Sequence, residues 1–266
     1  MVHSGTNQRV QNCGSCRSLE SVIRVLVIIP AFNEASTLPA VLATLRDRCP
    51  DYDVVVVDDG STDDTAGIAR STGVTVLTLP YNLGIGGALR TGFRYAVAQN
   101  YDAAVQVDAD GQHDPGLISQ LVDQLDHADF AVGTRFSTGT ANYEVGRTRR
   151  FAMRTLELTV RLLTGRRYTD TSSGFRAFNR DVLRYFALTY PSEYMESVEA
   201  LVNASYQGFR IVEVPIDMQA RAGGEPSNMH AKLAYHYVRV IATLLVRAQR
   251  RTGVAAPVQP VMGVSA

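Results

Sequence analysis

Short, continuous apolar runs separated by helix-length segments are the feature that most constrains this chain. Residues 25–29 read Val-Leu-Val-Ile-Ile, residues 54–57 are four valines, and residues 103–107 read Ala-Ala-Val-Gln-Val. Runs without polar alternation indicate strands that are buried on both faces of a sheet. With helical patterns between them, they predict an α/β fold: a mostly parallel sheet with helices on both faces.

The predicted elements alternate along the chain. Strands are expected over residues 25–29, 54–57, 74–77, 103–107, 130–132 and 211–214. Helices are expected over 37–48 with Ser36 as the cap, 63–72, 86–99, from Pro115 onward, and over 147–164, 193–207 and 229–250. Without a repeat or a linker, we expect one domain over 23–251, between a disordered tail over 1–22 and a flexible tail over 252–266.

Composition excludes several classes of function. The 266 residues are 45% hydrophobic and 20% charged, which suits one large domain with a sizeable core. A formal net charge of zero argues against general nucleic-acid binding.

The sequence has no pattern of a membrane span or a secretory signal. No apolar run approaches the roughly 20 residues that span a bilayer, and the first residues lack the apolar core of a secretory signal. The 3 cysteines cannot close a disulfide framework, so we expect a cytoplasmic protein.

Polar clusters follow three of the predicted strands. Asn33 and Glu34 come after the first strand, Asp58 and Asp59 after the second, and Asp108 begins the cluster after the fourth. In open parallel α/β sheets, ligands bind beyond the carboxyl ends of the strands. A single Asp-Asp-Gly-Ser stretch is typical of a turn and cap, but three such clusters at one edge favour a binding site.

The stretch after the fourth strand, Asp-Ala-Asp-Gly-Gln over residues 108–112, has the donor types of a metal site. Its hard oxygen ligands are Asp108, Asp110 and Gln112, and they suit Mg²⁺ or Mn²⁺ completed by substrate phosphates. An ordinary turn is the alternative interpretation. We interpret the neighbouring His113 as a residue that supports the site or the fold, with a role as a ligand as the alternative.

Four motifs together resemble the family-two glycosyltransferases of the GT-A fold, a Rossmann-like fold of nucleotide-diphospho-sugar transferases. They are residues 28–35 (IIPAFNEA), 57–63 (VDDGSTD), 82–88 (NLGIGGA) and 108–113 (DADGQH), and the resemblance covers about residues 24–245. Segments in the second half are most similar to the branch of dolichol-phosphate mannose synthases and polyprenyl-phosphate glycosyltransferases. These segments are 133–135, 149–150, 171–176, 213–216 and 221–227.

The resemblance implies roles for individual residues. The nucleotide pocket would be lined by Pro30, Ala31, Phe32 and Glu34, and Asp59 would contact the base or ribose. The metal bridging the diphosphate would be bound by Asp108, Asp110 and Gln112. Arg135 and Arg149 would lie near the phosphates, including that of the acceptor, and Arg221 would lie on a loop that closes over the donor.

Two departures from the family pattern limit these expectations. The branch often has a lysine in the loop after Arg221, where this chain has Pro226, Ser227 and Asn228. The chain also has no tryptophan, whereas processive family members hold their polymer with a Gln-x-x-Arg-Trp element. A polymer-building synthase is therefore not expected.

The expected activity is inverting, metal-dependent transfer of one sugar from a UDP- or GDP-sugar to a polyprenyl phosphate. A phosphate acceptor, with a second pKa of about 6, is mostly ionised at neutral pH and needs no base. The alternative is a soluble family-two enzyme that acts on a hydroxyl of a sugar, glycolipid or natural product. A hydroxyl acceptor would need a carboxylate base, for which Asp170 is the candidate; a loop cap for the residues that follow it is the alternative role.

A lipid acceptor implies contact with a membrane or a membrane protein. Residues 147–167 combine several arginines with interleaved apolar residues, as do residues 235–251. Basic amphipathic helices can lie at a membrane interface, although packing of the same helices on the sheet is the alternative. We therefore expect a cytoplasmic enzyme with peripheral membrane contact.

Overall fold

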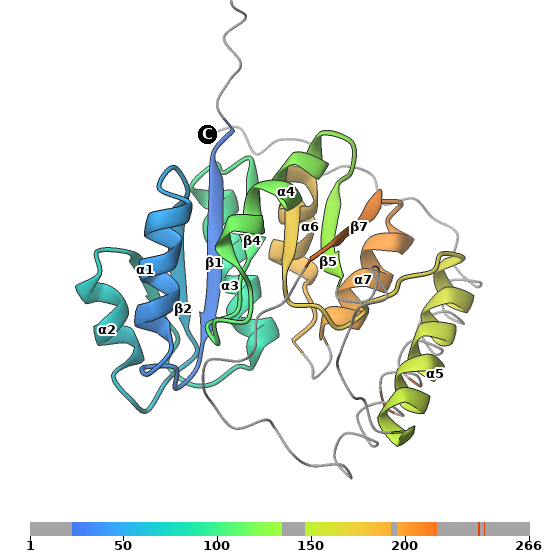
Figure 1. Cartoon of the computed structure of the whole chain (residues 1–266), viewed down its shortest axis with the longest axis horizontal. Helices are drawn as coiled ribbons and strands as arrows, with labels where there is room; N and C mark the ends of the chain where they lie inside the picture. The colour runs from blue at the N-terminus through green and yellow to red at the C-terminus, as the bar shows by residue number, and fades with distance from the viewer. Residues whose placement is uncertain (1–22, 135–146, 193–195, 217–238, 240–241, 243–266) are drawn as a thin grey trace, which may run out of the picture.

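The computed structural model describes residues 23–134, 147–192 and 196–216 and the single positions 239 and 242, with side chains left out for 147–153. In this part of the chain, seven strands form one sheet in the order β3-β2-β1-β4-β6-β5-β7 (Figure 1). The strands are β1 (Val25–Ala31), β2 (Asp53–Asp58), β3 (Thr75–Thr78), β4 (Ala103–Gln106), β5 (Phe130–Thr134), β6 (Arg176–Asn179) and β7 (Ile211–Pro215). Neighbours are parallel except at β6, which is antiparallel to β4 and β5. The predicted mostly parallel α/β sheet is confirmed.

Helices cover both faces of the sheet (Figure 1). One face is covered by α3 (Ile85–Ala98), α5 (Arg147–Thr164), α6 (Arg180–Thr189) and α7 (Glu196–Tyr206). The other face is covered by α1 (Leu38–Arg48), α2 (Thr65–Ser71) and α4 (Ile118–Asp123), with the short 3₁₀ turns η1 (Pro115–Leu117) and η2 (Gln124–Asp126) beside α4.

The apolar runs explain why both faces need cover. In β1, Leu26 and Ile28 belong to the core on the α3 side, whereas Val25, Val27 and Ile29 belong to the core on the α1 side. All five are at most 2% exposed. Because side chains alternate between the faces of a strand, a run that is apolar at every position needs helices on both sides.

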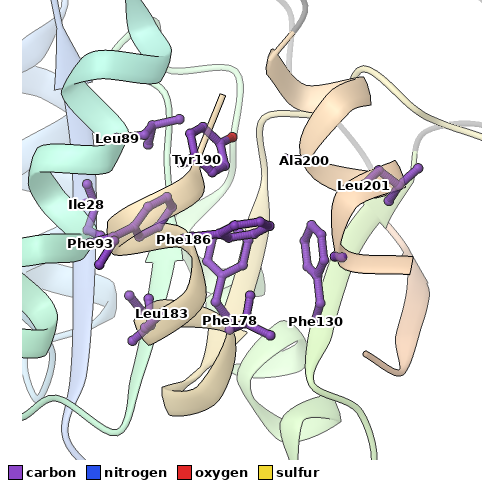
Figure 2. Packing of buried hydrophobic residues seen from close by; sticks show 14 of the residues in the cluster. Ile28, Leu89, Phe93, Phe130, Phe178, Leu183, Phe186, Tyr190, Ala200 and Leu201 are labelled. Atoms are coloured by element: carbon purple, nitrogen blue, oxygen red, sulfur yellow. The ribbon is translucent and has the colours of Figure 1, made fainter. Parts of the chain in front are cut away.

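An aromatic cluster ties the second half of the chain to the first (Figure 2). Phe93 on α3 meets the edge of Phe178 on β6, with ring centroids 5.1 Å apart and an interplanar angle of 79°. Phe178 packs in turn on Phe130 of β5 at 4.8 Å, and Tyr190 meets Phe93 at 5.0 Å. Aromatic pairs in these arrangements contribute about 0.5–1.5 kcal/mol beyond their buried area, so this cluster fixes α3 and α6 against the middle of the sheet.

Two elements are absent from the sequence-based expectations, β6 and α6. β6 has only four residues, and it begins with the charged Arg176, so no apolar run marks it. α6 does carry a readable start signal, because the side chain of Asn179 accepts a hydrogen bond from the Val182 N–H at 3.0 Å. Together they place an antiparallel strand in the middle of the sheet.

The predicted cap of the first helix is wrong. Thr37, not Ser36, occupies the N-cap position of α1, and its side chain makes no capping bond. Its hydroxyl instead donates to the Glu34 carboxylate at 2.6 Å. Both predicted tails lie outside the described residues, as does the predicted helix over 229–250 except for the single helical positions 239 and 242.

Asp129 joins three strands at the edge opposite the polar clusters. Its carboxylate accepts hydrogen bonds from the Arg210 N–H at 2.8 Å and from Asn179 Nδ2 at 3.0 Å. The Arg210 side chain is 62% exposed, and its guanidinium also pairs with the Asp129 carboxylate. The hydrogen bonds from Arg210, more than any other contact, hold the pKa of Asp129 below its ordinary value of 3.8.

Replacing Asp129 with Ala should lower the free energy of unfolding by about 1 kcal/mol at neutral pH, because the hydrogen bonds from Arg210 N–H and Asn179 lose their acceptor. A carboxylate whose pKa is lowered by folding adds stability above its ordinary pKa, and this contribution disappears as the pH falls through the folded value. Urea unfolding should therefore show the two proteins converging as the pH falls below 3.8. A difference that stays constant across that range would contradict the assignment.

Candidate active site

The strands that precede the polar clusters end at the same edge of the sheet. Ala31 on β1 pairs with Asp58 on β2, and the Asp59 N–H donates to the Ala31 carbonyl at 2.9 Å. On the other side of β1, the Val107 N–H donates to the Ile28 carbonyl at 3.1 Å. The loops that carry Glu34, Asp59 and Asp108 therefore lie next to one another, as the sequence predicts.

Hydrogen bonds join the loops after β1 and β2 into one unit. Asn33 has a positive φ of 57°, and its Oδ1 accepts from the Thr62 N–H at 2.8 Å. The Asn33 N–H donates to Ser61 Oγ at 3.0 Å. The Glu34 N–H donates to Thr65 Oγ1 at 2.9 Å. This unit, the β1–β2 unit, forms a wall beside the carboxyl end of β1.

The residues assigned to the nucleotide pocket lie along this wall. Pro30 and Ala31 close β1, and Phe32 directly after them is 43% exposed. The Glu34 carboxylate is engaged by the hydroxyl of Thr37. An exposed aromatic ring beside a polar loop can receive a planar ring by stacking, which is compatible with a nucleotide at this place.

Asp59 is buried at the centre of the edge, only 3% exposed. Its Oδ1 accepts a hydrogen bond from the Leu83 N–H at 2.8 Å. Burial raises the pKa of Asp59, although backbone N–H groups of Leu83 and Gly84 act against the shift. The carboxylate thus couples the β2 loop to the segment that starts α3.

Asp108 and Asp110 lie in a tight turn beyond β4. Gly111 has a φ of 75°, a conformation that glycine adopts without steric cost. The turn allows the Gln112 N–H to donate to Asp110 Oδ1 at 3.0 Å. Asp110 is 8% exposed, whereas the Asp108 side chain is 31% exposed. Two carboxylates and the amide of Gln112 are therefore gathered within five residues.

His113 contacts this turn through both nitrogens of its ring. Its Nδ1 accepts a hydrogen bond from the Asp108 N–H at 3.2 Å, and its Nε2 lies 3.8 Å from Asp108 Oδ2. The ring stacks on Phe175, with centroids 5.0 Å apart and an interplanar angle of 20°. These contacts agree with the interpretation of His113 as a supporting residue.

Gly174 packs directly against the Asp108 carboxylate. A Cβ atom added at residue 174 would overlap Asp108 Oδ2, so the carboxylate would have to shift. The backbone of Gly174 does not have a positive φ, so this close approach, and not backbone conformation, favours glycine here. The loop over 170–174 and the turn over 108–112 therefore form one structural unit.

The donor set of the turn fits a hard divalent cation. Among the described residues, no three His, Cys, Asp or Glu side chains are arranged so that they alone could hold a metal. Mg²⁺ sites in proteins commonly use only one or two carboxylates and take the remaining ligands from water and substrate phosphates. Asp108, Asp110 and Gln112 match that pattern.

Asp170 is buried in the loop that follows α5, 2% exposed. Its Oδ1 accepts hydrogen bonds from the N–H and the hydroxyl of Ser172, at 3.3 and 3.2 Å. These contacts are typical of a loop cap, which is the alternative role that the sequence offers for Asp170 besides that of a catalytic base. The Asp170 N–H donates to Glu213 Oε1 at 3.1 Å.

One buried arginine that contacts the 170–174 loop is not among the predicted site residues. Arg176 is fully buried and donates to the carbonyls of Ser197 and Thr171, at 3.1 and 3.4 Å. Burial raises the pKa of Glu196, against the opposing effects of the Ser197 hydroxyl and the Arg176 charge. Arg176 belongs to a motif of the resemblance, but only the structure reveals that it ties the 170–174 loop to α7.

Three predicted site residues lie wholly or partly outside the described residues. Arg135 and Arg221 lie outside the described residues, and for Arg149 only the backbone, near the start of α5, is described. Their assigned roles at the phosphates and over the donor remain predictions.

The chain matches the model of the family "Glycosyl transferase family 2" over residues 26–186, more than half of its length. It is 36% identical over 210 residues to the undecaprenyl-phosphate mannosyltransferase of Micrococcus luteus, a match that covers 76% of this chain and 86% of that protein. It is 33% identical over 210 residues to the polyprenol monophosphomannose synthase of Mycolicibacterium smegmatis, covering 76% and 79%.

A solved structure shares the fold. Glucosyl-3-phosphoglycerate synthase from Mycobacterium tuberculosis, crystallised with Mn²⁺, UDP and glucosyl-3-phosphoglycerate, superposes with a TM-score of 0.67 at 24% identity. The match covers 86% of this chain and 81% of that one. This likeness agrees with the GT-A fold expected from the sequence.

Replacing Gly174 with Ala should weaken binding of Mn²⁺ in the presence of UDP or GDP by about tenfold or more, because the new Cβ displaces the Asp108 carboxylate. Titration calorimetry would measure the affinity. Gly116→Ala is the matched control, since its nearest atom, Asp114 Oδ1, lies at 3.2 Å from the added Cβ. Equal affinities in wild type and Gly174→Ala would show that Asp108 is not a metal ligand held by this contact.

Proposed function

The chain belongs to glycosyl transferase family 2, and we propose that it moves one sugar from a nucleoside-diphosphate sugar to a polyprenyl phosphate, with inversion at the anomeric carbon. The observation that carries the proposal is the turn with Asp108 and Asp110, fixed by Gly174 and His113 at the edge where the β1 and β2 loops end. The names of the two mannosyl-transferring relatives support the acceptor class.

Asp108, Asp110 and Gln112 would hold Mg²⁺ or Mn²⁺, whose charge offsets the negative charge of the departing nucleoside diphosphate by several kcal/mol. Pro30, Ala31, Phe32 and Glu34, which lie along the wall, would receive the nucleotide, and Asp59 would contact its base or ribose. These assignments put the diphosphate between the β1–β2 unit and the Asp108 turn.

The contacts of Asp170 favour an acceptor that needs no base. Its carboxylate is buried and engaged by Ser172, whereas a general base must reach the hydroxyl from which it removes a proton. A phosphate monoester is mostly ionised at neutral pH and can attack the anomeric carbon directly. Arg135 and Arg149 would hold that phosphate, and Arg221 would close over the donor and exclude water.

The outer side of α5 supports contact with a membrane. Leu156 and Val160 are buried on the side of α5 that packs on α7, 2% and 0% exposed, whereas Leu158 and Leu162 are 54% and 76% exposed. Arg154 and Arg161 are exposed as well, so leucines and arginines share the outer side, a pattern typical of helices that lie at an anionic lipid interface. No helix among the described residues is apolar over a sufficient length to cross a bilayer.

The function is tested with a panel of UDP- and GDP-sugars and a polyprenyl phosphate, with Mn²⁺ or with EDTA. We expect metal-dependent formation of a lipid-linked sugar by one donor and a loss of about a hundredfold or more in Asp110→Asn. Asp114→Asn, which alters a carboxylate in the same loop that caps η1, should retain activity. Transfer to hydroxyl acceptors without prenyl phosphate would overturn the proposal, and full activity in Asp110→Asn would overturn the metal assignment.

Replacing both Leu158 and Leu162 with Glu should reduce binding to vesicles that contain anionic lipid, because the substitutions remove apolar area and add like charge. Vesicle flotation would measure the bound fraction, with an expected loss of about tenfold. Leu188→Glu changes an equally exposed leucine on α6, 75% exposed, and should leave binding intact. Unchanged flotation of the double variant would refute membrane contact through α5.

A further inference from the structure

The carboxylate of Glu213 on β7 accepts three hydrogen bonds on a single oxygen. Its Oε1 receives the Thr169 N–H at 2.7 Å, the Thr169 hydroxyl at 3.0 Å and the Asp170 N–H at 3.1 Å. Hydrogen bonds to an ionised acceptor are roughly twice as strong as those between neutral groups. Glu213 is therefore the anchor of the backbone at residues 169 and 170.

The hydrogen bonds around Glu213 continue to the end of β5. The hydroxyls of Thr169 and Thr134 lie 2.7 Å apart. A threonine hydroxyl has one hydrogen, and Thr169 gives its hydrogen to Glu213, so the Thr134 hydroxyl must donate to Thr169. Thr134 is 1% exposed and directly precedes Arg135. One chain of hydrogen bonds thus links Glu213 to Asp170 and to Thr134, the residue before Arg135.

The anchored segment also supports the Asp108 turn. Residues 169 and 170 begin the loop that reaches Gly174, and Gly174 packs against Asp108 Oδ2. The loop is also held by the contact of Arg176 with the Thr171 carbonyl at 3.4 Å and by the hydrogen bonds of Ser172 to the Asp170 carboxylate. Without Glu213, two backbone N–H groups and one hydroxyl would lose their shared acceptor inside a largely buried region.

We propose that Glu213 is a positioning residue for sugar transfer, which holds the 169–174 loop and the end of β5 in the geometry that the reaction requires. The inference rests on the proposed function, because it takes the loop and the Asp108 turn to be parts of the site for sugar transfer. Glu213 does not touch the reacting atoms; it acts through Asp170, through Gly174 and through Thr134, which precedes Arg135.

Three variants test this role. Glu213→Val suits a strand but removes the acceptor, whereas Glu213→Gln keeps an amide oxygen in the same place. Asp129→Ala is the matched control, because Asp129 also anchors the β5–β7 pair through several hydrogen bonds but lies at the opposite edge of the sheet. Hydrogen–deuterium exchange of peptides covering 169–174, calorimetry with UDP or GDP and Mn²⁺, and transfer kinetics are measured for each variant.

We expect Glu213→Val to speed exchange at residues 169–174 by about tenfold or more and to lower kcat by about tenfold to a hundredfold, as misplacement of site groups does. The affinity for the nucleotide with Mn²⁺ should change less than kcat, because the β1–β2 unit has its own hydrogen bonds. Glu213→Gln should restore most of both losses, and Asp129→Ala should change neither.

Unaltered exchange and kcat in Glu213→Val, or equal kinetic losses in Asp129→Ala, would overturn the inference. A wild-type protein that transfers no sugar to polyprenyl phosphate would instead overturn the proposed function. In that case, exchange at residues 169–174 would still decide whether Glu213 holds the loop.

Discussion

The close contact between Gly174 and the Asp108 carboxylate is the constraint on which the site depends. It joins a loop from the second half of the chain to a turn from the first half, at the point where β4 ends beside the start of the antiparallel strand β6. A side chain of any size at residue 174 would occupy the space of a carboxylate oxygen. Tertiary packing thus leaves room for the Asp108 carboxylate in this orientation, and His113 accepts a hydrogen bond from the backbone N–H of the same residue.

This constraint explains why the chain needs its second half. The first four strands already form a parallel sheet whose loops gather Glu34, Asp59 and Asp108 at one edge. β6 then places the 170–174 loop beside that edge, and the aromatic cluster of Phe93, Phe178 and Phe130 holds β6 and its neighbours in position (Figure 2). The core of the protein and the geometry of the site are therefore coupled.

Local sequence signals predicted much of this architecture. The apolar runs of β1, β2 and β4 and the helix over 147–164 could be read directly, because burial on both faces and helical periodicity leave strong patterns. β6 could not be found, since four residues that begin with a charged arginine carry no such pattern. The roles of Glu213 and Arg176 depend on contacts with residues 44 and 21 positions away, which no local pattern encodes.

The most direct test of the account is anomalous diffraction from crystals grown with Mn²⁺ and UDP or GDP. We predict a manganese peak among the oxygens of Asp108, Asp110 and Gln112, with the diphosphate completing the shell and the nucleotide lying along the wall after β1. A manganese peak or a nucleotide bound away from the Asp108 turn would contradict the central claim.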